Sequence, residues 1–78
     1  RCRIAQDPFL QLDLARTRLR RFERLRDHRR GGEAEEEFLR TSPRIGPYLT
    51  LRRGLMFERE IIDWCDWALS VLAARRAD

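Results

Sequence analysis

The feature that most constrains the fold is a long segment, from Tyr48 to Leu72, that contains no proline and only one glycine, Gly54. Its apolar residues recur at helical spacing in two interleaved seven-residue rhythms. The first seam comprises Leu51, Leu55, Glu58, Ile62, Cys65, Leu69 and Leu72. The second seam comprises Gly54, Phe57, Ile61, Trp64, Ala68 and Val71. Together the two seams cover more than half of the helix circumference, so this helix must pack against more than one neighbour.

The length of the chain indicates where some of those neighbours come from. A chain of 78 residues buries only about 60% of the surface of its unfolded state, and it usually needs a staple, a metal or a partner. Its two cysteines, Cys2 and Cys65, form no Cys-x-x-Cys pair, and there is one histidine. These residues form no recognisable zinc or iron-sulfur site, so we expect neither a metal nor a cofactor. We therefore expect a homodimer, with Cys65 as a small buried apolar residue and no role for Cys2.

The segment before Tyr48 predicts two further helices. Asp7-Pro8 is typical of a helix start, with aspartate as the N-cap and proline as the first helical residue. We expect the first helix over about residues 7–30, because the pair Gly31-Gly32 supplies the left-handed backbone that ends a helix. A short helix is expected over about residues 33–40. The apolar stripe of the first helix consists of Leu12, Ala15, Leu19, Phe22 and Leu25.

The last helix is expected over about residues 47–75, beginning at Pro47 after a turn rich in proline and glycine. No strand pattern occurs in the chain. We therefore predict an all-α fold for residues 1–78 as a single domain. Two long helices, joined by a short helix or loop, would form an intermolecular helical bundle or coiled-coil dimer.

The last helix also resembles a known family. Its start, Leu49-Thr-Leu-Arg-Arg-Gly54, precedes the aromatic–glutamate pair Phe57-Glu58 and then the pair Trp64-Cys65. This succession resembles the last helix of PadR-type bacterial transcriptional regulators. More narrowly, it resembles the helical region called the virulence-activator-alpha C-terminal domain. The resemblance covers Pro47 to Leu72, about a third of the chain.

The resemblance implies that the complete protein has an N-terminal winged helix-turn-helix that reads DNA. Nothing in this chain is similar to that domain. The chain would then be the dimerisation and regulatory half, which holds two DNA-reading domains at fixed spacing and contacts DNA only through the domain that it lacks. PadR-like regulators respond to small effectors, but the resemblance assigns no effector to particular residues here.

The distribution of charge suggests an alternative function. All 17 basic residues are arginine, and residues 1–30 hold ten of them against four acidic residues. Eight lie between Arg16 and Arg30, as expected of a helix that neutralises nucleic-acid phosphates. However, these arginines surround the helix, and its one aromatic residue, Phe22, belongs to the apolar stripe. They could instead pair with carboxylates at Glu33 and Glu35 to Glu37, or with those of the last helix. A third interpretation is a small adaptor that binds another protein through the apolar arc.

Enzymatic activity is not expected. The chain offers one histidine, His28, two serines and no lysine, and the carboxylates that follow Gly32 form a surface run. Catalysis requires such groups to converge in a pocket. No apolar run reaches the length that spans a membrane. A cytoplasmic protein without membrane contact is the default expectation.

These patterns predict two sets of functional residues. Glu58 is the only charge in the first seam, and we expect it to meet Arg18 or Arg26, because a buried carboxylate needs a partner. Met56 and Trp67 share one edge of the apolar arc, as a possible docking or effector edge if they are not simply the border of the core. The expected dimer and helix-packing residues are Leu12, Leu19, Phe22, Leu51, Leu55, Phe57, Glu58, Ile61, Ile62, Trp64, Cys65, Leu69 and Leu72.

Overall fold

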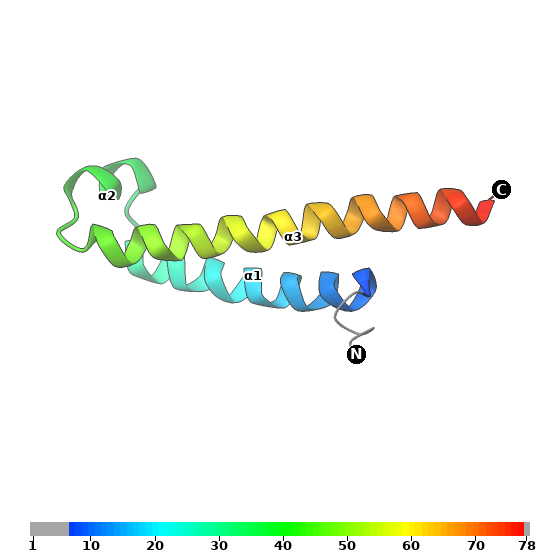
Figure 1. Cartoon of the computed structure of the whole chain (residues 1–78). Helices are drawn as coiled ribbons and strands as arrows, with labels where there is room; N and C mark the ends of the chain where they lie inside the picture. Colours follow the sequence, from blue (N-terminus) through cyan, green and yellow to red (C-terminus); the bar gives the residue numbers. More distant parts are fainter. Residues whose placement is uncertain (1–6, 78) are drawn as a thin grey trace.

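The computed structural model describes residues 7–77 and has three helices in that part of the chain. Helix α1 spans Pro8–Arg30, α2 spans Glu35–Thr41 and α3 spans Ile45–Ala77. Figure 1 shows α1 and α3 side by side in opposite directions, with α2 at the end where the chain turns back. The expected all-helical architecture of two long helices joined by a short one is confirmed, and the described residues contain no strand.

The ends of α1 follow from the residues that cap it. The Asp7 side chain accepts a hydrogen bond of 2.9 Å from the Phe9 backbone N–H, as an N-cap aspartate does. At the other end, Gly31 adopts a left-handed conformation with φ of 56°, and its N–H donates to the carbonyls of Asp27 and His28. Glycine adopts this conformation without steric cost, so α1 ends where the glycine pair predicts.

The boundaries of the other two helices differ by about two residues from the predicted ones. Helix α2 begins at Glu35, with Ala34 as the N-cap and no side chain capping it. Helix α3 begins at Ile45 instead of Pro47 and continues to Ala77. Proline is tolerated at the third residue of α3 because the first four N–H groups of a helix lack intrahelical partners.

The core lies between α1 and α3 and is built mainly from the first seam. Where the two long helices pack together, they bury Leu12 and Ala15 of α1 and Leu51, Leu55 and Cys65 of α3. Within the same seam, Ile62 and Leu69 are half-buried. Leu72 is 41% exposed, because the last turns of α3 project beyond the start of α1 (Figure 1).

Helix α2 is held against α3 by the side chain of Tyr48, which is fully buried. The rings of Phe38 and Tyr48 lie 4.6 Å apart between centroids, at 53°. The Tyr48 hydroxyl donates to Glu35 Oε2 at 2.6 Å, and Arg52 Nε pairs with the same oxygen at 2.9 Å. Nothing in the sequence patterns singled out Tyr48 or Glu35 as partners.

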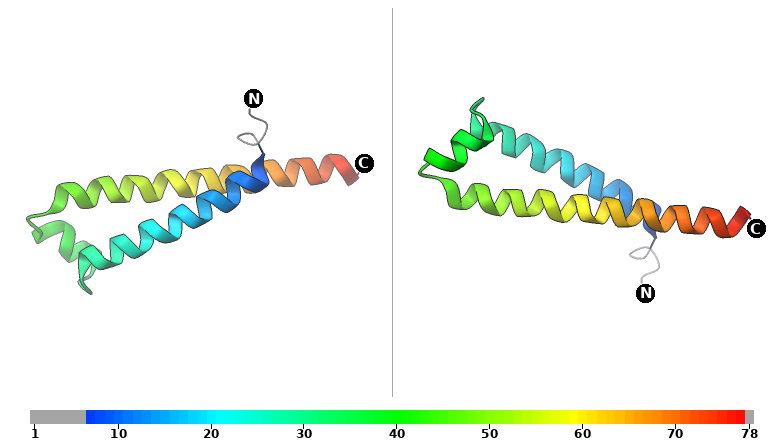
Figure 2. Two further views of the ribbon diagram at one scale, coloured as in Figure 1. Left: turned by 90° about the horizontal axis from the view of Figure 1, so that it is seen from below. Right: turned by 90° about the horizontal axis from the view of Figure 1, so that it is seen from above.

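The domain is elongated, with dimensions of 54 × 26 × 16 Å. Figure 2 shows that α1 and α3 are close together near the start of α1 and diverge toward α2. Large side chains fill part of the space between the diverging helices, and the rest remains as a pocket, described below.

Candidate functional site

The two sides of α3 that flank the core differ in chemistry. On one side lie Arg52 and Arg59, seven residues apart, which pair with Glu35 at 2.9 Å and with Glu23 at 3.6 Å. On another side lie Phe57 and Trp64, also seven residues apart, which are 58% and 47% exposed. A spacing of seven residues returns to nearly the same side of a helix. The hairpin therefore has a polar face held by ion pairs and an apolar face that the described residues 7–77 leave largely exposed.

The apolar face is the second seam of α3. Val71 at its far end is 38% exposed, while Gly54, Ile61 and Ala68 are half-buried. A shallow groove beside Trp64 is lined by Gln11 of α1 together with Ile61 and Phe57. The second seam is thus the part of the predicted packing surface that α1 leaves largely uncovered.

Glu58 faces α1 from the first seam and forms an ion pair there. Arg18 Nε donates to Glu58 Oε2 at 2.9 Å, and the Glu58 side chain is only 5% exposed. The expectation of an arginine partner from the first helix is confirmed, and Arg18 of the same chain is that partner. Arg26, the other expected partner, donates instead to the neighbouring Asp27. That hydrogen bond is the main reason why the pKa of Asp27 is lowered.

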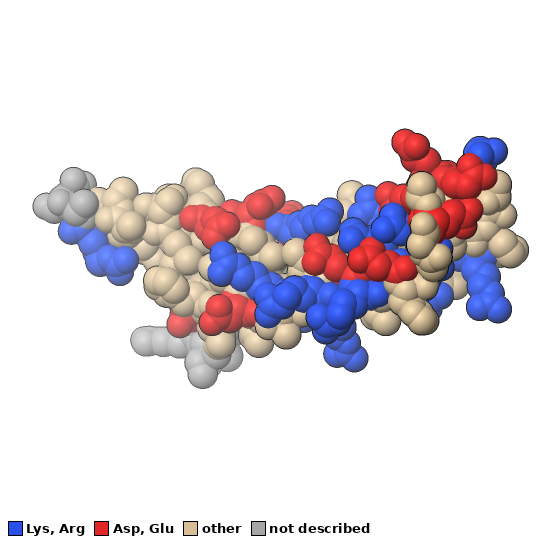
Figure 3. All heavy atoms as spheres, turned by 180° about the vertical axis from the view of Figure 1, so that it is seen from behind, with Lys and Arg blue, Asp and Glu red and all other residues tan. Residues whose placement is uncertain are grey.

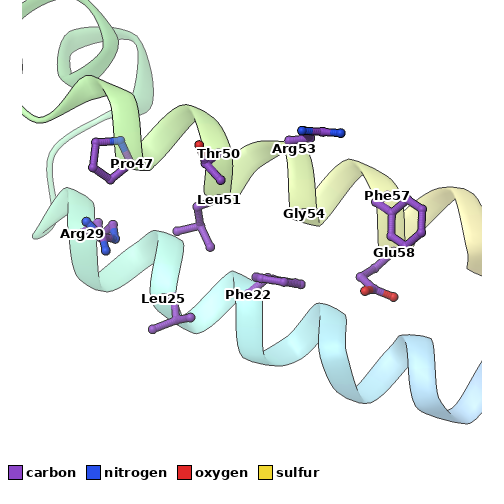
Figure 4. Close-up of a pocket in the computed structure, with 10 residues that line it drawn as sticks. All are labelled: Phe22, Leu25, Arg29, Pro47, Thr50, Leu51, Arg53, Gly54, Phe57 and Glu58. Carbon is purple, nitrogen blue, oxygen red and sulfur yellow. The ribbon is translucent and has the colours of Figure 1, made fainter.

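The pocket between the diverging helices has a volume of about 580 Å³. Figure 4 shows Phe22 and Leu25 of α1 on one side of it, and Leu51 and Phe57 of α3 on the other. Glu58 reaches from α3 toward α1 at one end of the pocket. The pocket is therefore mainly apolar, with one carboxylate in its wall.

At Gly54 a side chain of α1 approaches α3 closely. A Cβ atom added at Gly54 would lie 3.0 Å from Phe22 Cζ. Glycine therefore makes room for the Phe22 ring of α1. This contact also explains how a half-buried phenylalanine can close part of the gap between the helices.

The remaining predicted residues of the first helix and of the proposed edge are placed as follows. Leu19 and Phe22 are half-buried between the helices, whereas Leu25 is 44% exposed. Met56 and Trp67 are 61% and 63% exposed, so neither is a core residue of the single chain. Leu39 and Leu49 line a second groove with Met56, beside α2.

Several arginines are paired with carboxylates, and the two signs of charge lie side by side on one face of the molecule. Figure 3 shows the two signs of charge alternating over the face that it displays. Within α1, Arg26 and Arg30 both contact Asp27. Within α2, Arg40 pairs with Glu37. The interpretation that these arginines pair with carboxylates of the last helix is confirmed for Arg18, which pairs with Glu58 of α3. Arg26 and Arg30 pair instead with Asp27 of α1 itself.

Several sequence interpretations concern isolated residues. Cys65 is fully buried, and burial raises the pKa of its thiol, as expected for a small core residue. His28 is exposed near the end of α1. Cys2 lies outside the described residues. Among residues 7–77, no cluster of His, Cys, Asp and Glu could hold a metal ion. None of the helices in that part of the chain is long and apolar enough to cross a membrane.

Comparison with known proteins gives a family match. The family model described as virulence activator alpha C-term matches residues 10–73, which include all of α2 and most of α1 and α3. No curated protein and no solved structure matches the chain significantly. The match extends well beyond the segment that carried the resemblance and covers both long helices and the connection between them. The chain therefore belongs to the virulence activator alpha C-term family, as a helical domain of the regulatory type.

Proposed function

We propose that this chain is the dimerisation and regulatory domain of a PadR-like transcriptional regulator. Two copies would pair through the second seam and hold two DNA-reading domains at a fixed spacing. Dimeric DNA readers recognise paired half-sites whose separation mirrors the symmetry of the protein. The helical domain would thereby determine which DNA sites fit. In this proposal the chain has no enzymatic role, and DNA is contacted only by another domain of the complete protein.

The observation that carries this proposal is the exposed second seam. The first seam is used within the chain, where it packs on α1. The second seam presents Phe57 and Trp64, both about half exposed, on the side away from the ion pairs of Arg52 and Arg59. An apolar surface of this kind on a small domain is typical of a protein–protein contact. A symmetric contact between identical copies is the most common way to cover it.

The proposal predicts a specific assembly and a specific way to disrupt it. Light scattering coupled to gel filtration should give twice the chain mass of 9.4 kDa at micromolar concentration. Phe57→Glu should yield a folded monomer, because the contact would bury an unpaired carboxylate. Phe9→Glu is the matched control, since Phe9 is 60% exposed at the first turn of α1 and outside the second seam. It should leave the dimer intact.

A stable, well-folded parent chain of 9.4 kDa would overturn the proposal. In that case, the apolar face would be free to bind a different protein, as in an adaptor. Equal effects of Phe57→Glu and Phe9→Glu on a dimeric parent would place the contact elsewhere on the molecule. Circular dichroism of each variant separates loss of the dimer from loss of the fold.

A further inference from the structure

Another pocket lies at the end of the hairpin where the chain turns back and where Figure 1 places α2. We call it the turn pocket, because it is bordered by the last turns of α1, by α2 and by the turn that leads into α3. Its lining residues are Leu25, His28, Arg29, Phe38, Ser42, Pro43 and Arg44. Its volume of about 470 Å³ lies within the usual range of about 300–1,000 Å³ for small-molecule sites.

The charged groups around the turn pocket are cationic. Arg29 and Arg44 contribute guanidinium groups, His28 contributes an imidazole, and none of the lining residues is acidic. Within residues 7–77, neither of these guanidinium groups forms an ion pair, whereas the adjacent Arg30 pairs with Asp27. Two arginines without carboxylate partners, beside a pocket that contains no carboxylate, favour an anionic ligand.

The rest of the lining is apolar, apart from one hydroxyl group. Phe38 is 7% exposed and Leu25 is 44% exposed, so the two side chains offer a partly accessible apolar wall. Ser42 Oγ accepts from the Arg44 backbone N–H at 3.1 Å, which leaves the hydroxyl hydrogen available to a ligand. A ligand that uses both parts of the lining has an anionic head and an apolar body.

The number of arginines narrows the choice of anion. Two guanidinium groups balance two negative charges, and arginine matches the geometry of phosphate oxygens. A phosphate monoester carries close to two negative charges above its second pKa of about 6, and it presents three acceptor oxygens. A carboxylate or a phosphodiester carries only one negative charge. A phosphate monoester is therefore the best match.

We propose that the turn pocket binds a small phosphate monoester with an apolar body. Arg29 and Arg44 pair with the phosphate oxygens, and Ser42 donates its hydroxyl hydrogen to the same group. The apolar body packs against Leu25 and Phe38. The lining includes no residue of the second seam, so the site is separate from the proposed dimer contact.

Three related phosphates test this proposal. Phenyl phosphate is a monoester with an aromatic body, methyl phenyl phosphate keeps that body but is a singly charged diester, and inorganic phosphate lacks the body. Each is titrated into the chain at constant pH. The ring protons of His28 report binding in nuclear magnetic resonance spectra, because the chain has a single histidine.

Phenyl phosphate should bind most tightly of the three. We expect its binding to saturate with a dissociation constant of about 1 mM or lower. Inorganic phosphate should bind about tenfold more weakly, because the phenyl body buries roughly 60 Å² of apolar surface. The diester should bind about fivefold more weakly, since it forgoes one exposed ion pair at the upper end of the usual strength.

Substitution of either lining arginine should weaken binding selectively. Arg29→Gln and Arg44→Gln should each bind phenyl phosphate about fivefold more weakly than the parent chain does. Arg24→Gln is the matched control, because it changes the net charge equally, and Arg24 is exposed in α1 and does not line the turn pocket. At physiological salt it should bind as the parent does, since a remote charge is screened. All three side chains are exposed, so circular dichroism should show an unchanged fold.

Four results would overturn the proposal. A His28 signal that shows no saturable shift up to about 10 mM phenyl phosphate would reject the site. Equal affinity for the monoester and the diester would show that the pocket does not select a second negative charge. Equal affinity for phenyl phosphate and inorganic phosphate would exclude the apolar body. Equal weakening by Arg24→Gln and Arg44→Gln would reduce the binding to attraction by net charge. Light scattering measures the dimer separately, so none of these results bears on the proposed function.

Discussion

At the scale of single residues, Gly54 makes room for the Phe22 ring between the two long helices. Alanine is favoured over glycine within a helix by about 1 kcal/mol. An added methyl group would lie 3.0 Å from the Phe22 ring, so the ring must move by a few tenths of an ångström. That ring borders the open pocket and has space to move. We therefore predict that Gly54→Ala raises the free energy of unfolding by up to about 1 kcal/mol.

Gly46→Ala serves as the control for this substitution. Gly46 also lies in α3, and an added Cβ there meets nothing within 4 Å. Urea unfolding monitored by circular dichroism compares the two variants with the parent chain. If Gly54→Ala unfolds at lower urea than the parent while Gly46→Ala does not, the Phe22 ring is fixed and the prediction fails.

The partner of Glu58 could be predicted because a lone carboxylate in an apolar seam requires a cation. The sequence narrowed the choice to Arg18 and Arg26, but the register of α1 against α3 decides between them. In that register Arg18 lies opposite Glu58, whereas Arg26 donates to its neighbour Asp27. Helix periodicity shows which residues share a face. It does not show how far one helix slides along another.

The role of Tyr48 in docking α2 was not predicted, because it too depends on how the helices are placed against one another. It precedes Leu51 by three residues and so continues the line of the first seam, but its partners Phe38 and Glu35 come from α2. A seven-residue helix is too short to be stable alone and depends on packing against other elements. The place where α2 docks on α3 therefore cannot be predicted from the residues of α2 alone. The signal that was available is a single tyrosine near a run of carboxylates.

At the scale of elements, the docking of α2 on α3 should depend on pH. The hydrogen bond from Tyr48 and the charge of Arg52 lower the pKa of Glu35. Burial and the bond to Glu35 raise the pKa of Tyr48. The lowered pKa stabilises the fold above the ordinary glutamate value of 4.5, and this contribution is lost as the pH falls through the folded-state value. The raised pKa stabilises the fold below 10.0, and this contribution is lost as the pH rises through the folded-state value.

The alkaline half of this prediction can be measured on one residue, because the chain has a single tyrosine. A spectrophotometric titration of the phenol should show Tyr48 ionising above 10.0. Glu35→Gln should shift the ionisation toward the ordinary value, since it removes the carboxylate that accepts from the hydroxyl. Glu36→Gln is the control, because Glu36 is exposed in the same turn. A parent chain in which Tyr48 ionises at its ordinary pKa would contradict the burial of its hydroxyl.

The ends of the helices show which residues are enough to predict a helix boundary from the sequence. The N-cap Asp7 and the C-cap Gly31 predicted α1 to within one residue, because each acts through its own backbone contacts. The start of α3 predicted from Pro47 was wrong by two residues. Proline is compatible with any position in the first turn of a helix and does not mark its first residue. Caps that act through a specific hydrogen bond therefore locate a helix end more accurately than a residue that is only tolerated there.

At the scale of the whole molecule, the hairpin has a single thin core and two contrasting faces. The wide apolar arc predicted that α3 needs more than one neighbour, and α1 covers mainly its first seam. The exposed second seam and the pocket both lie on the side away from the ion pairs of Arg52 and Arg59. Periodicity could predict the arc. The pocket arises from the divergence of α1 and α3, which depends on the packing of Phe22 and α2 and has no signature in the sequence.

The overall charge leads to a last prediction, about nucleic acid. The chain has a net charge of +4, so it should attract DNA weakly at low salt. Arg18, Arg26 and Arg30 are engaged with carboxylates, and the two signs of charge alternate on the surface in Figure 3. Few phosphates would therefore be neutralised together. We predict binding that does not depend on DNA sequence and that is lost at physiological salt, because it rests on release of counterions alone.

Fluorescence anisotropy with two labelled duplexes of equal length and different sequence checks this prediction. The two should bind with similar affinity at low salt, and the logarithm of the affinity should fall steeply with the logarithm of the salt concentration. Arg18→Gln is an informative variant, since Arg18 is committed to Glu58, and it should change DNA binding little despite removing one charge. Protection of one defined sequence at physiological salt would instead favour a nucleic-acid-binding module. Under the proposed function, discrimination between duplexes would come from a DNA-reading domain of the complete protein and not from this helical domain.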